Sequence, residues 1–238
     1  MIKVILLTTL LLLSSSADWS FTVVGDFGLV EDLSYAKKLF TAIDDYSQDN
    51  PFEFFVTVGD NVYPNGITTD DDSGLDVTLR ELFQKPNIKN KPIHATLGNH
   101  DCYGDADAMV DYTLYNWDMQ HDFWYTFYDE QGSPSEDNCQ VGMFFLNGCK
   151  LSCRGRAGTG PCLDMKVMTE EEVDIHFTWM DYFLKKARRE CKWVVTFNHY
   201  QMHSVDRNGD RGDSVHDILP VVIEAGVDVF FMGHSHNM

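Results

Sequence analysis

The chain has 238 residues, of which 44% are hydrophobic and 13% aromatic, and its formal net charge at pH 7 is −19. This length and composition suffice for a single domain with a sizeable core. The acidic charge argues against a nucleic-acid-binding protein, because nucleic acids are bound by basic surfaces. It also implies that affinity for any anion must come from cations at a local site.

The first 17 residues have the pattern of a secretory signal peptide. Lys3 precedes an apolar run at residues 4–13, and small residues follow at 14–17. This run is too short to span a bilayer, and no later apolar run is long enough. A buried strand is the alternative, but Lys3 and the serines fit export better. We therefore expect a signal peptide at 1–17, one domain at 18–238, and a secreted or lysosomal protein without a membrane span.

The rest of the chain alternates between strand-like and helical patterns. Strands are predicted where short hydrophobic runs occur, at residues 21–24, 52–58, 93–97, 141–146, 193–197 and 227–232. Helices are predicted where apolar residues keep helical spacing, at residues 33–43, 75–83 and 169–189. The last helix begins with a capping box formed by Thr169 and Glu172. This alternation predicts an α/β fold, in which ligands bind beyond the carboxyl ends of the strands.

All six cysteines follow the predicted signal peptide: Cys102, Cys139, Cys149, Cys153, Cys162 and Cys191. An even number of cysteines in an exported chain predicts disulfide bonds, whose pairing the sequence leaves open. A zinc cluster of Cys149, Cys153 and Cys162 is the alternative. These three lie in a loop with glycines and arginines that disulfides would stabilise, so the disulfide interpretation is the stronger one.

Side chains that can bind metals follow five of the predicted strands directly. The sequences are GDFG at 25–28, GDNVY at 59–63, GNHD at 98–101, NH at 198–199 and GHSH at 233–236. The carboxyl ends of neighbouring parallel strands lie at one rim of a sheet, and small glycines allow loops to approach a common centre. Each motif alone is weak, because an Asp after a strand is often an N-cap. The five motifs together indicate a metal site.

The donor types in these motifs favour iron, zinc or manganese. They combine carboxylate, imidazole and amide groups, and no cysteine lies within them, which argues against a thiolate-rich centre. Two ions about 3.5–4 Å apart, bridged by one carboxylate, would suit displacement at phosphorus. The sequence therefore predicts a dinuclear metal centre.

In order and spacing, the five motifs resemble those of the purple acid phosphatases, in the calcineurin-like metallophosphoesterase superfamily. Tyr63 makes the resemblance specific, since most other members lack a tyrosine three residues after the bridging aspartate. The resemblance implies a four-layer α/β/β/α sandwich of two mixed sheets. It implies a ferric site of Asp26, Asp60, Tyr63 and His236, and a site for Fe(II), Zn(II) or Mn(II) made of Asp60, Asn99, His199 and His234. Asp60 would bridge the two ions.

The same resemblance implies an acid phosphatase that hydrolyses phosphate monoesters, either small molecules or phosphoproteins. Hydroxide bound to the metals, which ferric iron permits at acidic pH, would attack the phosphorus. His100, next to Asn99, is the candidate general acid for the leaving group. Asp101 either orients His100 or makes a loop hydrogen bond, and Tyr63 could instead be a packed aromatic residue.

The sequence departs from the family at three points, one of which is that Cys102 and Cys162 have no clear counterpart there, so the disulfide pattern stays open. The loop after His199 reads YQMH where the animal enzymes usually carry a proline and a tryptophan, so substrate contacts there do not transfer. Family members also continue for several dozen residues after the GH-x-H motif. We therefore expect this chain to lack C-terminal strands and to expose a sheet edge.

Two other functions fit the same motifs. One is a catalytically silent scaffold or anchor in the secretory pathway, which keeps the phosphatase fold, as some relatives do. The other is a related metallophosphodiesterase or nucleotidase that uses zinc or manganese. The complete set of candidate ligands favours an enzyme over a scaffold, and Tyr63 favours a purple acid phosphatase over a diesterase.

Overall fold

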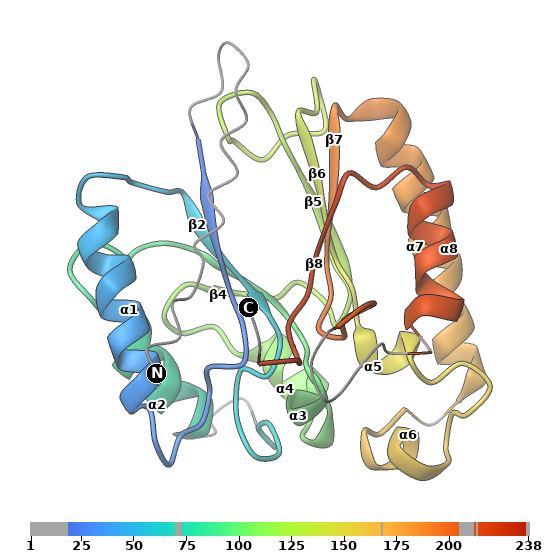
Figure 1. Ribbon diagram of the computed structural model, residues 1–238, viewed down its shortest axis with the longest axis horizontal. Coiled ribbons are helices and arrows are strands. Elements are labelled where there is room, and N and C mark those ends of the chain that lie inside the picture. The colour runs from blue at the N-terminus through green and yellow to red at the C-terminus, as the bar shows by residue number, and fades with distance from the viewer. Residues whose placement is uncertain (1–18, 70–72, 168, 205–211, 213, 237–238) are drawn as a thin grey trace.

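The computed structural model describes residues 19–236, apart from 70–72, 168, 205–211 and 213. The predicted signal peptide at 1–17 and the last two residues lie outside the described part of the chain. The described residues form four layers, with two β-sheets face to face in the middle and helices on both outer sides (Figure 1). Among the described helices, none is both long and apolar enough to cross a membrane.

The first sheet has the order β1-β2-β3-β4. Its strands are β1 (Phe21–Val24), β2 (Phe54–Val58), β3 (Ile93–Thr96) and β4 (Trp117–Asp118). All three pairings in this sheet are parallel. Helices α1 (Ser34–Ser47) and α2 (Ser73–Phe83) connect its first three strands and cover its outer face (Figure 1). The carboxyl ends of these strands therefore lie at one rim.

The second sheet has the order β5-β6-β7-β8. Its strands are β5 (Trp124–Tyr128), β6 (Val141–Phe145), β7 (Trp193–Phe197) and β8 (Val229–Phe231). β5 pairs antiparallel with β6, and the other two pairings are parallel. Helices α7 (Glu170–Glu190) and α8 (Leu219–Glu224) cover its outer face, and the π-helical turn η1 (Ser214–Ile218) leads into α8 (Figure 1).

Four short helices lie in the connections that follow β3 and β6. They are α3 (Asn99–Tyr103), α4 (Ala106–Asp111), α5 (Gly148–Leu151) and α6 (Gly160–Asp164). All four lie at the same end of the sandwich, at the bottom of Figure 1. This end is where the motif loops leave the strands.

Alternate residues of β2 pack against the outer helices on one face and against the second sheet on the other. Phe55 packs on Phe40 of α1 and Phe83 of α2, with ring centroids 6.0 and 4.9 Å apart. Phe54 points to the other face and stacks on Tyr128 of β5, with centroids 5.0 Å apart. Because both faces of β2 are buried, its sequence is a continuous hydrophobic run rather than an alternating one. Burial of each such ring contributes about 1.5–3 kcal/mol.

The predicted α/β fold with two facing sheets and outer helices is confirmed. The prediction that both sheets are mixed needs correction, because only the second sheet contains an antiparallel pair in the described residues. The first sheet is parallel because helical crossovers separate β1, β2 and β3, and such crossovers join parallel strands. The sequence patterns missed the two-residue β4 and the aromatic β5.

The predicted capping box at the start of α7 is present. Thr169 Oγ1 accepts a hydrogen bond from the Glu172 N–H at 3.2 Å, and Glu172 Oε2 accepts one from the Thr169 N–H at 2.9 Å. Two of the four N–H groups that a helix start leaves unpaired are satisfied by side chains close in sequence, so this helix start could be predicted locally.

The six cysteines form three disulfides, and a zinc cluster is excluded for them. Cys102 pairs with Cys149, Cys139 with Cys191, and Cys153 with Cys162. The Cys153–Cys162 bridge is local, and Cys139–Cys191 joins the segments that lead into β6 and β7. Only Cys102–Cys149, of the three, joins α3, which follows β3 of the first sheet, to α5, which follows β6 of the second sheet.

Candidate metal centre

The five motif segments meet at the carboxyl ends of β1, β2, β3, β7 and β8. Two groups of three potential ligands lie there, and in each group the donor atoms are all within 4.8 Å of one another. The first group is Asp60, His199 and His234, and the second is Asp26, Asp60 and His236. Asp60 belongs to both groups, so its carboxylate lies between them.

Asp60 is almost completely buried, with 1% of its surface exposed. Its Oδ1 accepts a hydrogen bond from the backbone N–H of His100 at 2.9 Å and lies 3.4 Å from His199 Nε2. Its Oδ2 accepts a hydrogen bond from the Tyr63 hydroxyl at 2.8 Å. The two oxygens of one carboxylate are thus directed to different sides of the site.

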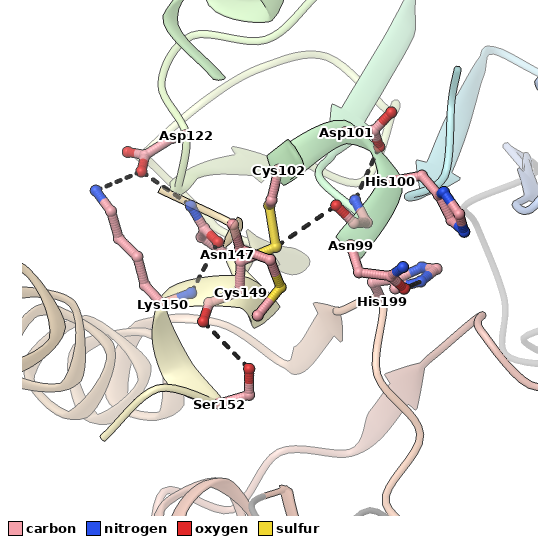
Figure 2. The surroundings of a disulfide bond; sticks show 12 residues. Asn99, His100, Asp101, Cys102, Asp122, Asn147, Cys149, Lys150, Ser152 and His199 are labelled. Carbon is pink, nitrogen blue, oxygen red and sulfur yellow. Dashed lines mark hydrogen bonds and ion pairs between the residues drawn. A yellow bond between two sulfur atoms is a disulfide. The ribbon is translucent and has the colours of Figure 1, made fainter. Parts of the chain in front are cut away.

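The first group also contains Asn99. His199 Nε2 lies 3.1 Å from Asn99 Oδ1 and 3.2 Å from His234 Nδ1. His199 Nδ1 donates to the Val58 carbonyl oxygen at 2.9 Å, which fixes the ring and leaves Nε2 directed at the centre. Figure 2 shows Asn99 at the start of α3 with the His199 ring beside it.

The second group also contains Tyr63. His236 Nε2 lies 3.3 Å from Asp26 Oδ1 and 3.1 Å from the Tyr63 hydroxyl. The His234 backbone N–H donates to both Asp26 oxygens at 3.1 Å, so the last motif is tied to the first. All seven residues that the resemblance implied as ligands are therefore brought together, although they come from segments far apart in the sequence.

Backbone strain concentrates at this site. Asp26, Asp60, His234 and His236 have φ angles of +58°, +54°, +70° and +51°. Left-handed conformations of this kind cost non-glycine residues on the order of 1 kcal/mol or more each, and they cluster at functional sites. The surrounding structure imposes these conformations on four of the candidate ligands, which supports a functional rather than a structural role.

Two glycines allow the loops to approach so closely. A Cβ on Gly98 would lie 2.2 Å from Asp60 Oδ1, a distance too short for two non-bonded atoms. Gly59 has a φ of +88°, and a Cβ there would lie 2.8 Å from His199 Nδ1. Any larger residue at either position would push Asp60 or His199 out of place.

Asp60 and His199 form a charged pair among the protein's own groups. Burial of Asp60 opposes its ionisation, but the neighbouring His199 lowers the pKa of the carboxyl to about 2. Burial opposes protonation of His199 too, yet Asp60 raises the His199 pKa to about 9. Burial and the carboxylates of Asp60 and Asp26 raise the Tyr63 pKa far above its usual value. Binding of a metal ion by His199 Nε2 and the Tyr63 oxygen would therefore be accompanied by release of their protons.

His100, the candidate general acid, lies at the edge of this centre. Its Nδ1–H donates to the Pro64 carbonyl oxygen at 2.5 Å, and its ring lies 4.3 Å from that of Tyr63. Because a carbonyl oxygen only accepts hydrogen bonds, this contact leaves Nε2 as the nitrogen that can exchange a proton. The half-buried ring is thus held beside the candidate ferric ligand.

Asp101 makes loop hydrogen bonds, which decides between its two interpretations. Its carboxylate accepts from the backbone N–H groups of Asn61, Val62 and Gly98 at 2.8–3.1 Å and from the Asn61 side-chain amide at 2.9 Å. Asp101 is fully buried. It holds the loop after β2 against the loop after β3, and so fixes Asp60 relative to Asn99.

Sequence reasoning missed two residues that support the site. Asn147 lies two residues after the end of β6, and its side chain caps α5 through the Lys150 N–H at 3.1 Å. Tyr200 is buried with its ring 4.9 Å from that of His234. The signal for Asn147 was present, because an Asn-Gly pair follows that predicted strand. Tyr200 had no local signal, since only folding brings it against His234.

The donor set fits a pair of metal ions. It consists of carboxylate, imidazole, phenol and amide groups, which suit iron, zinc and manganese. The described cysteines are all in disulfides, so none offers a thiolate. Two groups that share one carboxylate can hold two ions with Asp60 between them.

The chain belongs to the calcineurin-like phosphoesterases, because the model of that family matches residues 20–238. Among its curated relatives is purple acid phosphatase 17 of Arabidopsis thaliana, 24% identical over 93% of this chain and 63% of the relative. Another is tartrate-resistant acid phosphatase type 5 of Sus scrofa, 23% identical over 97% of this chain and 65% of the relative. The chain thus spans less than two thirds of the length of these two relatives.

A solved structure shares the fold. It is GAP50, the anchor in the inner membrane complex of Plasmodium, which superposes with a TM-score of 0.73 at 17% sequence identity. The superposition covers 92% of this chain and 66% of GAP50. At this identity the likeness establishes the shared fold alone.

Proposed function

We propose that this protein is an acid phosphatase that hydrolyses phosphate monoesters at a dinuclear centre of Fe(III) with Fe(II), Zn(II) or Mn(II). One observation carries the proposal: the two groups of clustered donors share Asp60. A carboxylate common to two sites is what a bridged pair of ions requires. The relatives named as a purple acid phosphatase and a tartrate-resistant acid phosphatase support the same activity.

Each candidate ligand has a role in this proposal. Fe(III) would be held by Asp26, Asp60, Tyr63 and His236, and the divalent ion by Asp60, Asn99, His199 and His234. When bound, the two ions would activate a water molecule and neutralise the charge of the phosphoryl oxygens. A chain with a net charge of −19 repels phosphate at long range, so its affinity for substrate depends on this local positive charge.

His100 would protonate the leaving oxygen of the phosphate ester. Its Nδ1–H is fixed on the Pro64 carbonyl oxygen, so a protonated ring offers Nε2–H to the substrate. The His100 backbone N–H also donates to Asp60 Oδ1, which couples the position of the acid to that of the bridging carboxylate. Proton donation at this place lowers the barrier for the departure of an alkoxide or phenoxide.

The test combines metal analysis, a visible spectrum and hydrolysis of p-nitrophenyl phosphate at pH 5. We expect about one iron per chain and a visible charge-transfer band from the Tyr63 phenolate to Fe(III). Tyr63→Phe should lose the band, whereas Tyr35→Phe, at a 79% exposed position outside the site, should keep it. A folded protein with two bound ions but no hydrolysis of any aryl phosphate would contradict the proposal.

A second candidate is a secretory-pathway scaffold or anchor without activity. The observation that favours it is the fold shared with GAP50, which is described as an anchor. A folded but inactive and colourless protein would support this scaffold. A colourless protein that hydrolyses phosphodiesters or nucleotides with zinc or manganese would support a related diesterase or nucleotidase instead.

We also propose that the protein is exported to a secreted or lysosomal location. Three disulfides in the described residues suit an oxidising compartment, and an acidic compartment suits the proposed activity. The size of the precursor and of the exported protein tests this, since removal of residues 1–17 would leave Asp18 as the first residue. A protein retained in the cytosol with all cysteines reduced would contradict the proposal.

A further inference from the structure

One disulfide lies directly behind the candidate divalent site. Cys102 is three residues after Asn99 on α3, so both occupy the same face of that short helix. Cys149 lies on α5, and its sulfur is 3.5 Å from the carbonyl oxygen of Gly98, which precedes Asn99. Figure 2 shows the disulfide between α3 and α5, with Asn99 and His199 close beside it.

The α5 side of this disulfide is firmly supported within the second sheet. Asp122 is buried next to β5, and its Oδ2 lies 2.6 Å from Lys150 Nζ and accepts from the Asn147 amide at 2.9 Å. Asn147 in turn caps α5. The α5 backbone also abuts the loop that carries His199, since a Cβ on Gly148 would lie 2.5 Å from Asn198 Oδ1. The position of α5 is therefore coupled to that of His199.

The α3 side is supported within the first sheet. Asp101 binds the backbone N–H groups of Asn61, Val62 and Gly98, so α3 and the Asp60 loop are held together without help from the second sheet. The contact between Asn99 and His199, 3.1 Å long, joins these two well-supported halves. Beside it, the Cys102–Cys149 disulfide is the covalent link between them.

We propose that the Cys102–Cys149 disulfide is a positioning element of the metal centre, which holds Asn99 at the correct distance from His199 and thereby sets the affinity for the divalent ion. The inference rests on the proposed dinuclear centre. Without the disulfide, the two halves of the divalent site would separate by small amounts, and a bound ion would lose optimal contact with Asn99. The ferric group, which does not include Asn99 or His199, would be affected less.

The chain offers a matched control for this inference. The two cysteines are 47 residues apart in Cys102–Cys149 and 52 apart in Cys139–Cys191, so both disulfides constrain the unfolded chain to a similar degree. The second bridge lies before β6 and β7, at the end of the sheet opposite the site. Removing either disulfide should therefore cost similar global stability, but only one removal should change the metal centre.

The first experiment measures Mn²⁺ binding by calorimetry in iron-loaded protein. We expect the Kd for Mn²⁺ to rise about 10–100-fold in the Cys102→Ala/Cys149→Ala double variant, as for other supports of metal ligands, with the iron chromophore retained. The Cys139→Ala/Cys191→Ala variant should stay within about threefold of wild type, the range of a distant change that leaves the ligands in place. Equal affinities in both variants would overturn the inference.

The second experiment needs no variant and so is independent of how the variants fold. Binding linkage is reciprocal, so Mn²⁺ must stabilise the Cys102–Cys149 disulfide by the factor by which the disulfide favours Mn²⁺. In dithiothreitol redox buffers, followed by thiol alkylation and mass spectrometry, we expect Mn²⁺ to shift its reduction equilibrium about 10–100-fold, or about 30–60 mV. Cys139–Cys191 should not shift. The same shift for both bridges, or none for either, would contradict the inference.

Failure of this inference and failure of the proposed function are distinguishable. Wild-type protein that binds no divalent ion would overturn the dinuclear centre and with it the role of the disulfide. Wild-type protein that binds the ion, together with a Cys102→Ala/Cys149→Ala variant that binds it equally well, would overturn only the role of the disulfide.

Discussion

The two sheets contribute to the candidate site in different ways. The loops of the first sheet supply its oxygen donors, of which Asp60 and Asn99 are buried, and Asp101 binds the loops after β2 and β3 together. The second sheet supplies imidazoles, and the last of them, His236, has a side chain that is 59% exposed, against 2% for Asp60. Within the second sheet, the buried His199 is held by the Val58 carbonyl oxygen and the His234 backbone by Asp26, so the exposed His236 is its least enclosed ligand. Substitutions in the two halves should differ accordingly.

The largest effect is expected at the residue that both halves share. Asp60→Asn should lower kcat/KM for an aryl phosphate on the order of 10³-fold or more, because an amide neutralises the charge that would bridge two ions. Metal content, measured by mass spectrometry, should fall for both ions. Asp49→Asn, at an exposed position in the same sheet's connection, should leave both quantities unchanged. Loss of only one ion would mean that Asp60 does not bridge.

The next effect concerns the support of the first sheet. Asp101→Asn should reduce the free energy of unfolding by about 3 kcal/mol. The amide NH₂ group would replace a carboxylate oxygen, so buried N–H groups that need an acceptor would face another donor. Urea unfolding at neutral pH measures this change. Asp111→Asn, which alters an exposed carboxylate nearby, should change stability by less than about 0.5 kcal/mol. Equal stabilities for the two variants would show that Asp101 is not a structural tie.

Two buried histidines outside the site, His94 and His176, differ in their hydrogen bonding. His94 of the first sheet is hydrogen-bonded to the Tyr128 hydroxyl at 2.8 Å, and its Nδ1 lies 2.8 Å from Asp118 Oδ2. His176 of α7 is fully buried and stacks on Phe123, and neither ring nitrogen has a hydrogen-bond partner. Burial lowers the His176 pKa to about 3, while nearby Asp122 opposes the shift and Lys150 and His121 reinforce it.

Because His176 is buried without a hydrogen-bond partner, we expect the protein to lose stability in acid. Between pH 7 and 5 the unfolded chain protonates His176, whereas the folded protein does not, so stability falls as the pH falls. At pH 5 the loss is about 2 kcal/mol, at 1.36 kcal/mol per pH unit below 6.5. His176→Leu should remove it, so that the stability of the variant relative to wild type rises by that amount from pH 7.5 to 5. The control is His216→Gln at an exposed position, and an identical rise in both variants would contradict the interpretation.

The smallest effect is expected at the start of α7. Thr169→Ala should destabilise the protein by about 1 kcal/mol, because the capping box loses its hydroxyl. Thermal unfolding is sufficient to detect this change. Thr178→Ala on the exposed face of the same helix should instead be neutral or slightly stabilising, because alanine has the higher helix propensity. A stabilising Thr169→Ala would mean that the cap contributes nothing.

Local patterns were sufficient for the features that depend on local physics. The hydrophobic runs predicted β1, β2, β3, β6, β7 and β8 within a few residues, and the cap of α7 was predicted from Thr169 and Glu172. The five motifs contain every residue that converges on Asp60, so the candidate site could be predicted as a set. The metal roles of these residues, the signal peptide and any further C-terminal strands stay predictions.

Only the tertiary structure decided how these parts act on one another. The sequence allowed all pairings of its cysteines, and the fold selected Cys102–Cys149 by bringing α3 against α5. The fold also determined the role of Asp101, since the Asn61 N–H from which it accepts a hydrogen bond belongs to a loop 40 residues earlier. Residue types and their spacing along the chain determine which donors and ligands are available, because those properties are local. Which of them meet depends on contacts between distant segments, and these exist only after the chain has folded.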